Sequence, residues 1–411
     1  MKTFSIVVVS VVFAKLVKNQ FEIAKWETLM LYSGGFTFFY VSGLGYTLLS
    51  FIKKYENYEY NNIFKNSFIL LFAFGFFSCI AIVITDYFTK SSQIDLMIFS
   101  VFGLYILGNV CSSVTEYIFI AKKQFSNLVL WGIFNLITFC ISPFLLIIEG
   151  LNFNTLIIYL SAIGFIKLFI TLFFIETPFE FKNLSYIKPL LKFNLPVILS
   201  LLLGSGYIYI ANFIIKKEVS ESDFNIFRYG SREFPLFVVL ANSFSIILGS
   251  TASTDFEEKN FWTKLQINHR RLIFQIFIPA LFLVLFSPFI FKVLFSVHFV
   301  KSYKIFNILL LTIIARVLFP QSLLMGRGIT KFSFYASFAE FITGILLSYF
   351  LLKIYGIEGV AWAITIAFFI EKIVLIFFCY RNNIAFHRSI NFKWYLLFSI
   401  VLLLCFLFNY F

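Results

Sequence analysis

Charged side chains are scarce in this chain of 411 residues. Asp, Glu, Lys and Arg make up 13% of the sequence, whereas 60% of the residues are hydrophobic and the mean hydropathy is +0.92. A soluble protein of this length needs a polar surface around its core, and this composition does not supply one. The composition therefore excludes a soluble globular protein and indicates a chain that lives in lipid.

Cysteine, histidine and nucleotide motifs are also rare or missing. The five cysteines lie in or beside apolar runs, and the three histidines are far apart near the ends of such runs. This pattern favours packing over a disulfide framework or a metal site, so we expect no metal and no cofactor. The sequence lacks a GxxxxGK[ST] phosphate loop, which excludes nucleotide hydrolysis by that route.

Long polar connections are absent as well. The longest connections between apolar runs, 176–189 and 250–269, leave no room for an extramembrane catalytic or receptor domain. The net charge of +13 comes from Lys and Arg scattered through short connections. That distribution is typical of membrane topology and contact with anionic lipids, and it does not indicate nucleic-acid binding.

Apolar runs recur from one end of the sequence to the other. Each is about 20 residues long, which spans a hydrocarbon core about 30 Å thick at about 1.5 Å per helical residue. The runs are continuous rather than alternating, so they predict helices and not barrel strands. The sequence therefore predicts an all-α polytopic membrane protein with about 12–13 transmembrane helices. The predicted spans are 3–18, 26–51, 65–88, 94–120, 126–148, 154–175, 190–215, 222–249, 270–297, 303–326, 332–354, 357–380 and 394–411.

The connections predict how these spans are organised. More Lys and Arg fall on the cytoplasmic side when the N-terminus is placed in the cytoplasm, so we expect that orientation. The amphipathic connection 176–189 divides six spans from the next six, which is a common transporter plan. We expect an N-terminal bundle over residues 1–180, a C-terminal bundle over 181–385 and an extra hydrophobic segment over 386–411. Whether this last segment crosses the membrane or lies along its surface stays open.

Charged residues inside the predicted spans are candidate functional residues. A charge at the bilayer centre costs about 2.5–3.5 kcal/mol unless it faces protein or a wet cavity. With span 222–249 entering from outside, Arg228 lies roughly 9 Å and Arg232 roughly 15 Å deep, and Arg316 lies roughly 20 Å deep in its own span. The charged residues within spans are Lys167, Arg228, Arg232, Arg316, Lys372, Glu116, Glu233, Glu340 and Glu371.

The stretch "NIFRYGSREFPLF", residues 225–237, concentrates these charges. Arg228 and Arg232 are four residues apart and would share one face of a continuous helix. Pro235 is expected to bend this helix, and Gly230 permits close approach of another backbone. Guanidinium groups suit phosphate because their planar fork binds two oxygens and stays charged. The stretch therefore predicts a basic wall for an anionic substrate, with Arg316 as a third candidate.

Other roles for these charges remain open. Arg228, Arg232 and Arg316 would serve packing alone if Glu233 or Glu340 neutralised them. Glu233, Glu340 and Glu116 are candidate charge partners or sites for a coupling proton or cation. Lys167 and Lys372 are expected to be structural, Lys372 because Glu371 stands beside it. The candidate kinks or hinges are Pro196, Gly230, Pro235 and Pro320.

Two stretches of the second half resemble a known family. Phe193 to Pro196 opens one span, and Tyr229, Gly230, Glu233 and Pro235 follow in the next, as in polysaccharide flippases of the multidrug/oligosaccharidyl-lipid/polysaccharide exporter superfamily. Further matches are a Gly-rich turn at 326–330, the later Gly356, Gly359 and Ala361, and Gly43 with Gly45 in the first half. The resemblance covers most of residues 1–385. The short first span, the thirteenth segment and the arginine pair depart from the family pattern, so the role of Arg228 and Arg232 is inferred from this sequence alone.

The resemblance implies two six-helix bundles around a central cavity that opens alternately to each side of a bacterial cytoplasmic (inner) membrane. The implied substrate is an oligosaccharide linked to a polyprenyl pyrophosphate of the undecaprenyl type. It would be flipped to the outer leaflet for O-antigen, capsule or exopolysaccharide (lipopolysaccharide-type) assembly. The implied partners are membrane lipids and other glycan-assembly proteins, and the driving force would be an ion gradient or the membrane potential. The implied protein is a transporter and not an enzyme.

Three alternatives are weighed against this interpretation. A multidrug/cation antiporter of the same superfamily would favour acidic residues at mid-depth, whereas basic residues are the more numerous near the centre of the second half. A membrane-embedded polysaccharide polymerase or glycosyltransferase would need a sizeable outer loop. A non-transporting scaffold would leave the interior charges without a purpose.

Overall fold

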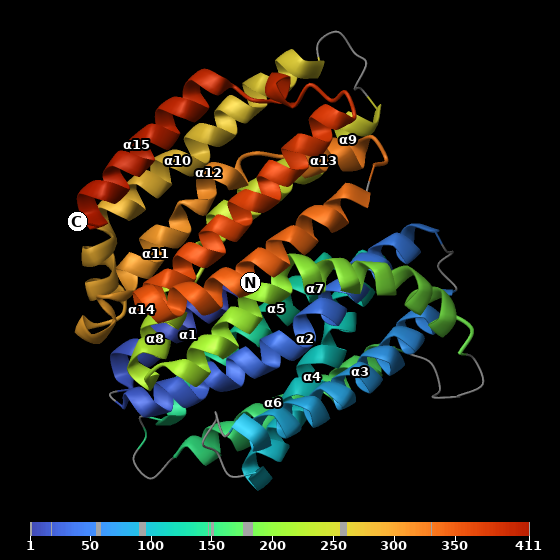
Figure 1. The fold of residues 1–411 in the computed structure, drawn as a ribbon. Helices are drawn as coiled ribbons and strands as arrows, with labels where there is room; N and C mark the ends of the chain where they lie inside the picture. The colour runs from blue at the N-terminus through green and yellow to red at the C-terminus, as the bar shows by residue number, and fades with distance from the viewer. Residues whose placement is uncertain are drawn as a thin grey trace. The chain divides into compact units, whose positions relative to one another are not determined.

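The computed structural model describes residues 2–17, 19–54, 59–89, 96–146, 148, 152–175, 184–254, 261–329 and 331–410. These residues form helices, turns and connections, and none of them lies in a strand. The chain divides into two compact units, unit 1 over Met1–Leu202 and unit 2 over Leu203–Phe411 (Figure 1). The division falls inside a helix, because the one that begins at Ile187 continues to Glu218. The predicted boundary between residues 180 and 181 lies outside the described residues.

Unit 1 is a bundle of apolar helices. Its elements are α1 (Lys2–Leu16), α2 (Gln20–Lys54), α3 (Tyr60–Thr89), α4 (Leu96–Ala121), α5 (Phe125–Ile141), η2 (Ser142–Leu146), α6 (Phe153–Phe174) and the first part of α7 (Ile187–Glu218). Helices α4 and α6 meet where Gly108 faces Gly164, and a Cβ on Gly164 would lie 2.5 Å from the Leu104 carbonyl oxygen. Only glycine permits such a close backbone approach, a packing mode common between helices in lipid.

Unit 2 contains the remaining helices, and several of them are short. They are the end of α7, α8 (Glu221–Gly230), α9 (Pro235–Thr254), α10 (Phe261–Leu294), η3 (Val297–Phe299), α11 (Ser302–Leu310), α12 (Thr312–Arg316), α13 (Pro320–Gly326), α14 (Lys331–Arg381), η4 (Phe386–Ser389) and α15 (Phe392–Tyr410). Two of these helices begin at a proline, α9 at Pro235 and α13 at Pro320, whereas α10 continues through Pro279 and Pro288.

Helix α14 is a hairpin of two helices. Its backbone leaves the helical region at Gly356, where φ is 60° and ψ is −145°. The rings of Phe332 and Phe378, near its two ends, stack 4.1 Å apart, so the chain runs back along itself. A positive φ of this kind favours glycine. The two limbs match the predicted spans 332–354 and 357–380.

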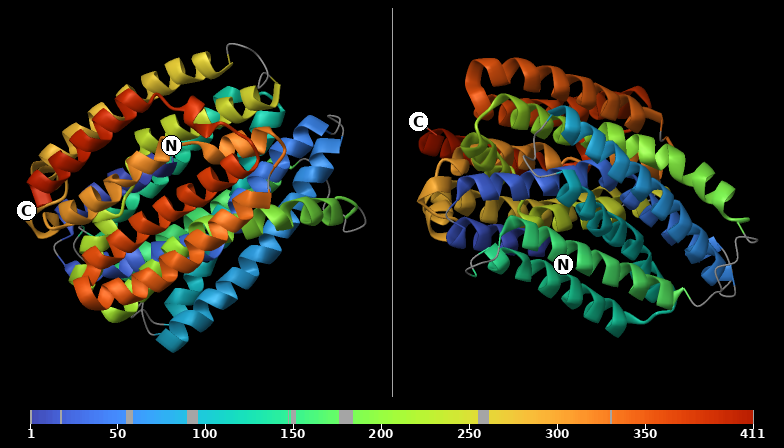
Figure 2. Two further views of the ribbon diagram at one scale, coloured as in Figure 1. Left: turned by 45° about the horizontal axis from the view of Figure 1, so that its top comes forward. Right: turned by 90° about the horizontal axis from the view of Figure 1, so that it is seen from below.

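Helix α15 packs along α10, and Figures 1 and 2 show the two side by side. The ring of Trp394 lies 5.0 Å from that of Phe274. At its other end the Asn409 amide donates to the Val284 carbonyl at 2.5 Å, and the Tyr410 hydroxyl donates to Glu358 at 2.5 Å. The thirteenth predicted segment is therefore a helix anchored at both ends within unit 2.

The described residues contain nine helices that are long and apolar enough to cross a membrane, or ten if α8 and α9 form one bent span. The hairpin α14 counts once in this number. Helix α1 is apolar but shorter than these helices, and α2 is not among the candidate spans. The candidate spans among the described residues are therefore fewer than the thirteen predicted runs. The prediction of an all-helical, multi-pass membrane protein is confirmed, and α15 is among the candidate spans.

Candidate functional site

Two interrupted helices form the centre of the candidate site in unit 2. Helix α8 ends at Gly230 and α9 begins at Pro235, with an angle of 46° between them. Helices α11, α12 and α13 form a second interrupted run, in which Pro320 begins α13. Proline is well suited to the first turn of a helix, so each helix restarts at its proline. Interrupted helices expose backbone groups at membrane depth and are a frequent place for substrate and ion sites in transporters.

Side chains from neighbouring helices satisfy the backbone at the second interruption. The Nε2 atom of His269 on α10 lies 3.0 Å from the Val317 carbonyl oxygen, and its Nδ1 atom accepts from the backbone N–H of Asn391 at 3.2 Å. Because Nδ1 accepts, Nε2 carries the proton and donates to Val317. Cys379 donates its thiol to the Pro320 carbonyl at 3.5 Å. These contacts keep the break between α12 and α13 in place.

An ion pair joins the two interruptions. Arg316 is the last residue of α12, Glu233 lies between α8 and α9, and their Nη2 and Oε1 atoms are 2.5 Å apart. The Arg316 side chain is 19% exposed and that of Glu233 is 56% exposed. Arg316, which the sequence placed deep in span 303–326, therefore has an acidic partner from the segment between α8 and α9.

An aromatic ring connects this pair to a second one. The ring of Phe368 lies 5.6 Å from the Arg316 guanidinium carbon and 4.8 Å from the Lys372 ammonium nitrogen. Lys372 in turn lies 2.8 Å from a carboxylate oxygen of Glu371. Both cations are within the distance at which an aromatic face attracts positive charge. The sequence-based expectation that Lys372 pairs with its neighbour Glu371 is confirmed.

A buried carboxyl group completes the cluster. Glu340 is 3% exposed, interacts electrostatically with Glu371 and Lys372, and has the Tyr207 hydroxyl as a hydrogen-bond partner. The Tyr207 ring packs on Gly344, where a Cβ atom would overlap it. Gly344 stands one helical turn beyond Glu340 on α14, so the bare glycine surface positions the tyrosine beside the acid.

We call this cluster the charge network and define it as Glu233, Arg316, Lys372, Glu371, Glu340 and Tyr207. It joins α7, the α8–α9 interruption, α12 and both limbs of α14. Three carboxyl groups meet two basic groups, so the network holds one acid more than it holds bases. Ionisable groups at membrane depth that pair with one another commonly mark ion or substrate pathways.

The two arginines of the α8–α9 region lie beside the network. Arg228 donates to the Asn212 side chain on α7 at 3.3 Å, and the Arg232 guanidinium carbon lies 5.1 Å from the Tyr229 ring centroid. Because α8 ends at Gly230, Arg232 stands beyond the helix, and the expected shared helix face of the two arginines is wrong. At Gly230 itself, a Cβ atom would lie 2.5 Å from the Ser302 carbonyl oxygen of α11.

The remaining predicted residues are not members of the charge network. Glu116 is on α4 in unit 1, whereas the other predicted acids and arginines belong to unit 2. Helix α7 continues through Pro196 without a break between Ile187 and Glu218. Pro235 and Pro320 each begin a helix, α9 and α13.

Sequence reasoning missed four residues of the site. Tyr207, Asn212 and Phe368 are ordinary members of apolar helices in sequence, and only the fold brings them to charged partners. His269 carried a visible signal, because it is a polar residue close to an apolar run, but its role depends on a carbonyl 48 residues away.

No protein-family model and no curated protein matches this sequence. Solved structures do match its fold. One is "Lipid II flippase MurJ, inward closed conformation", with a TM-score of 0.75, 18% identity, and coverage of 99% of this chain and 90% of that one. A second is an inward-facing multidrug resistance MATE family transporter of the MOP superfamily, with a TM-score of 0.67, 14% identity and coverage of 94% and 96%.

A third match is the eukaryotic MATE transporter AtDTX14, with a TM-score of 0.62, 13% identity and coverage of 99% and 95%. The chain therefore has the fold of the membrane transporters of the MOP superfamily, over almost its full length. These structural neighbours are transporters and not enzymes. At such low identity the similarity establishes the fold and not the substrate.

Proposed function

We propose that this chain is a transporter that flips a polyprenyl-pyrophosphate-linked oligosaccharide from the cytoplasmic to the outer leaflet by alternating access. Two lines of support meet here. The fold is shared with a structure named as a lipid II flippase. The observation that carries the proposal is the set of three arginines at the interrupted helices of unit 2, namely Arg228, Arg232 and Arg316.

The chemistry of these arginines suits a pyrophosphate. A guanidinium group has five N–H donors in a fixed fork, and one N–H of Arg228 donates to the Asn212 side chain. Phosphate oxygens accept two parallel hydrogen bonds from one such fork, which gives both charge neutralisation and orientation. In this proposal Arg228 and Arg232 hold the pyrophosphate, while the sugar meets polar groups and the lipid tail stays in the bilayer.

Arg316 has a second part in the proposal through its ion pair with the half-exposed Glu233. We assign this ion pair the role of a gate. The half-exposed Glu233 carboxylate releases Arg316 when an anionic substrate arrives, and takes it back when the substrate leaves. Arg316 would then pair alternately with Glu233 and with the anionic substrate. Because Glu233 and Arg316 lie at two different helix breaks, this exchange would change the relative positions of α8, α9 and α12, and alternating access requires such a movement.

The buried acids of the network supply the coupling step in this proposal. Glu340 and Glu371 interact electrostatically, and two like charges repel each other strongly in a low-dielectric region. A proton or monovalent cation bound there relieves the repulsion. Lys372 and Phe368 lie between this site and Arg316, so a change of charge at Glu340 reaches the gate through direct neighbours.

Complementation tests the proposed function. A bacterial host that makes a lipid-linked O-antigen or capsule repeat but lacks its own flippase is supplied with this chain at measured membrane abundance. Restoration of surface glycan supports the proposal, and a panel of hosts with different repeats reports the sugar class. If the protein is abundant in the membrane and no host in a broad panel regains surface glycan, the flippase proposal is overturned.

A second candidate function is export of organic cations in exchange for a proton or sodium ion. Two observations favour it: two of the matching structures are MATE transporters, one of them named as a multidrug resistance transporter, and the charge network holds three acids against two basic residues. Saturable binding of cationic dyes to the purified protein, lost on Glu340→Gln, would support this candidate. Absence of such binding at dye concentrations that saturate a known exporter would exclude it.

A further inference from the structure

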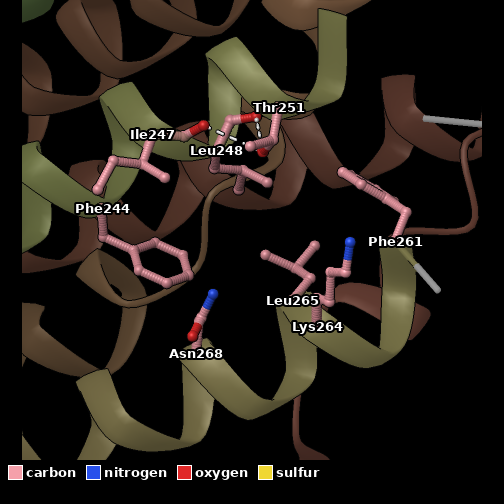
Figure 3. Close-up of a pocket in the computed structure, with 8 residues that line it drawn as sticks. All are labelled: Phe244, Ile247, Leu248, Thr251, Phe261, Lys264, Leu265 and Asn268. Atoms are coloured by element: carbon pink, nitrogen blue, oxygen red, sulfur yellow. Dashed lines mark hydrogen bonds between the residues drawn. The ribbon is translucent and has the colours of Figure 1, made fainter. Parts of the chain in front are cut away.

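A small pocket lies between α9 and α10 of unit 2. Its volume is about 110 Å³, and Figure 3 shows the eight side chains that line it. They are Phe244, Ile247, Leu248, Thr251, Phe261, Lys264, Leu265 and Asn268. None of them belongs to the charge network or to the arginine set, so the proposed transport site does not account for this pocket.

The two helices give the pocket walls of different chemistry. Helix α9 contributes the apolar side chains of Phe244, Ile247 and Leu248. Helix α10 contributes Lys264 and Asn268, whose side-chain nitrogens point towards α9 in Figure 3. Lys264 and Asn268 are one helical turn apart and share a face of α10. A ligand that fits both walls has an apolar part and an anionic or hydrogen-bond-accepting part.

Tryptophan and arginine side chains gather near this end of α10. Helix α9 ends at Thr254 and α10 begins at Phe261, so the pocket lies at one end of the helix pair. Trp262 is the second residue of α10, and the Arg270 guanidinium lies 5.1 Å from the Trp394 ring centroid. Tryptophan is enriched at the headgroup level of membranes, and lysine and arginine are enriched in the connections near the ends of spans. The composition around the pocket is therefore typical of the depth of lipid headgroups.

Two exposed arginines and one exposed apolar side chain lie on the same part of unit 2 as the pocket. Arg271 is exposed and lies two helical turns from Lys264 on the same side of α10. The Gln266 side chain donates to the Arg388 carbonyl at 3.0 Å, which brings another exposed arginine to this end of the unit. Ile247, at the pocket itself, is 60% exposed and offers a surface for a hydrocarbon chain.

We propose that this pocket binds the headgroup of an anionic phospholipid, with the phosphate at Lys264 and Asn268 and an acyl chain along Ile247 and Phe244. Basic pockets between membrane helices on the cytoplasmic side are a recurrent site for anionic lipid headgroups. The pocket is too small to enclose a lipid, so it holds the headgroup region while the chains remain in the bilayer. This site is independent of the transported molecule and stands whether or not the flippase proposal holds.

Native mass spectrometry of the purified full-length protein tests the site. The protein is loaded with phosphatidylglycerol or with phosphatidylcholine of the same chains, and lipid retention is compared. We expect selective retention of phosphatidylglycerol and a decrease of about tenfold in its affinity on Lys264→Gln, since one charge-assisted contact is lost. Lys292→Gln is the matched control, because it removes an equal charge from the far end of the same helix.

A second variant distinguishes loss of the lipid site from a change in folding. Ile247→Trp fills the pocket from its exposed side, where the larger side chain is tolerated, and should weaken phosphatidylglycerol retention while the melting temperature of the lipid-free protein stays unchanged. Equal retention of both phospholipids, or equal behaviour of Lys264→Gln and Lys292→Gln, would overturn the proposal. A polyprenyl phosphate that displaces phosphatidylglycerol at equimolar concentration would also overturn it, by assigning the pocket to a different lipid.

Discussion

Arg316 and Glu233 form an ion pair, 2.5 Å between Nη2 and Oε1, that joins two separately interrupted helices of unit 2. Each helix is interrupted ahead of a proline, Pro320 in one case and Pro235 in the other. The pair is therefore placed where a change of partner can move two helices at once.

Exchange of charges at this pair provides the first prediction. Arg316→Glu or Glu233→Arg alone places like charges together, and we expect transport to fall at least about tenfold, the effect of about 1.4 kcal/mol. The reversed pair, with both changes, should regain much of the activity. Glu233 is half-exposed, and ion pairs with an exposed member contribute about 1 kcal/mol or less to the free energy of unfolding. The melting temperature should therefore change little. Single variants that transport normally would exclude a gate here.

Substitution of Gly344 provides the second prediction. In Gly344→Ala the new methyl group overlaps the Tyr207 ring, so the tyrosine must leave its place beside Glu340. We expect a loss of stability of about 1–3 kcal/mol, as for other overpacked sites, together with loss of ion-dependent transport. Gly206→Ala is the control, since a Cβ there lies 3.7 Å from Phe341 and fits without strain. Equal melting temperatures for the two variants would contradict this packing.

Removal of the Glu340 charge provides the third prediction. We expect Glu340→Gln to transport at a rate that no longer responds to an imposed proton or sodium gradient, because the buried carboxyl group is the proposed coupling site. Transport by reconstituted protein with and without each gradient measures this response. Glu218→Gln, an exposed acid at the end of α7, should keep the gradient dependence of the unmodified protein. A gradient response that survives in Glu340→Gln would remove Glu340 from the coupling step.

The glycine contact of unit 1 provides the fourth prediction. Gly164→Ala places a methyl group 2.5 Å from the Leu104 carbonyl oxygen, which forces α4 and α6 apart. We expect a lower melting temperature, corresponding to about 1–3 kcal/mol. In Gly103→Ala the new atom would lie 3.5 Å from the Cys79 sulfur, an ordinary contact, and the melting temperature should stay unchanged. An unchanged melting temperature for Gly164→Ala would show that the two helices do not rely on this close approach.

The sequence predicted the helices well because each apolar run is bounded by polar residues. The predicted runs 65–88 and 154–175 fall within α3 and closely match α6. Proline and glycine in "YGSREFP" indicated a bend, but the sequence alone did not show that α8 ends at Gly230 and leaves Arg232 outside the helix. Glycine followed by proline is the local sequence signal both of a bend and of a break. The contact of Gly230 with α11, where the helix ends, depends on the fold and cannot be read from the local sequence.

The partners within the site were less predictable for a related reason. The pairing of Lys372 with Glu371 was predictable because the two are neighbours in sequence. Arg316 and Glu233 are 83 residues apart, and the sequence left open whether Glu233 or Glu340 neutralises the arginines. Tyr207 meets Glu340 only because Gly344 leaves room for its ring. Such partners are selected by tertiary packing, which one sequence without relatives does not display.

The central claim, that Arg228 and Arg232 hold a pyrophosphate in transit, is tested most directly in proteoliposomes loaded with a labelled polyprenyl-pyrophosphate oligosaccharide. Wild type, the double Ala variant, the double Lys variant and an Arg381→Ala control are compared at equal protein content. The account predicts translocation by wild type and the control, loss of at least about tenfold in the Ala pair, and partial recovery in the Lys pair, since lysine keeps the charge without the fork. Translocation by the Ala pair at the wild-type rate would contradict it.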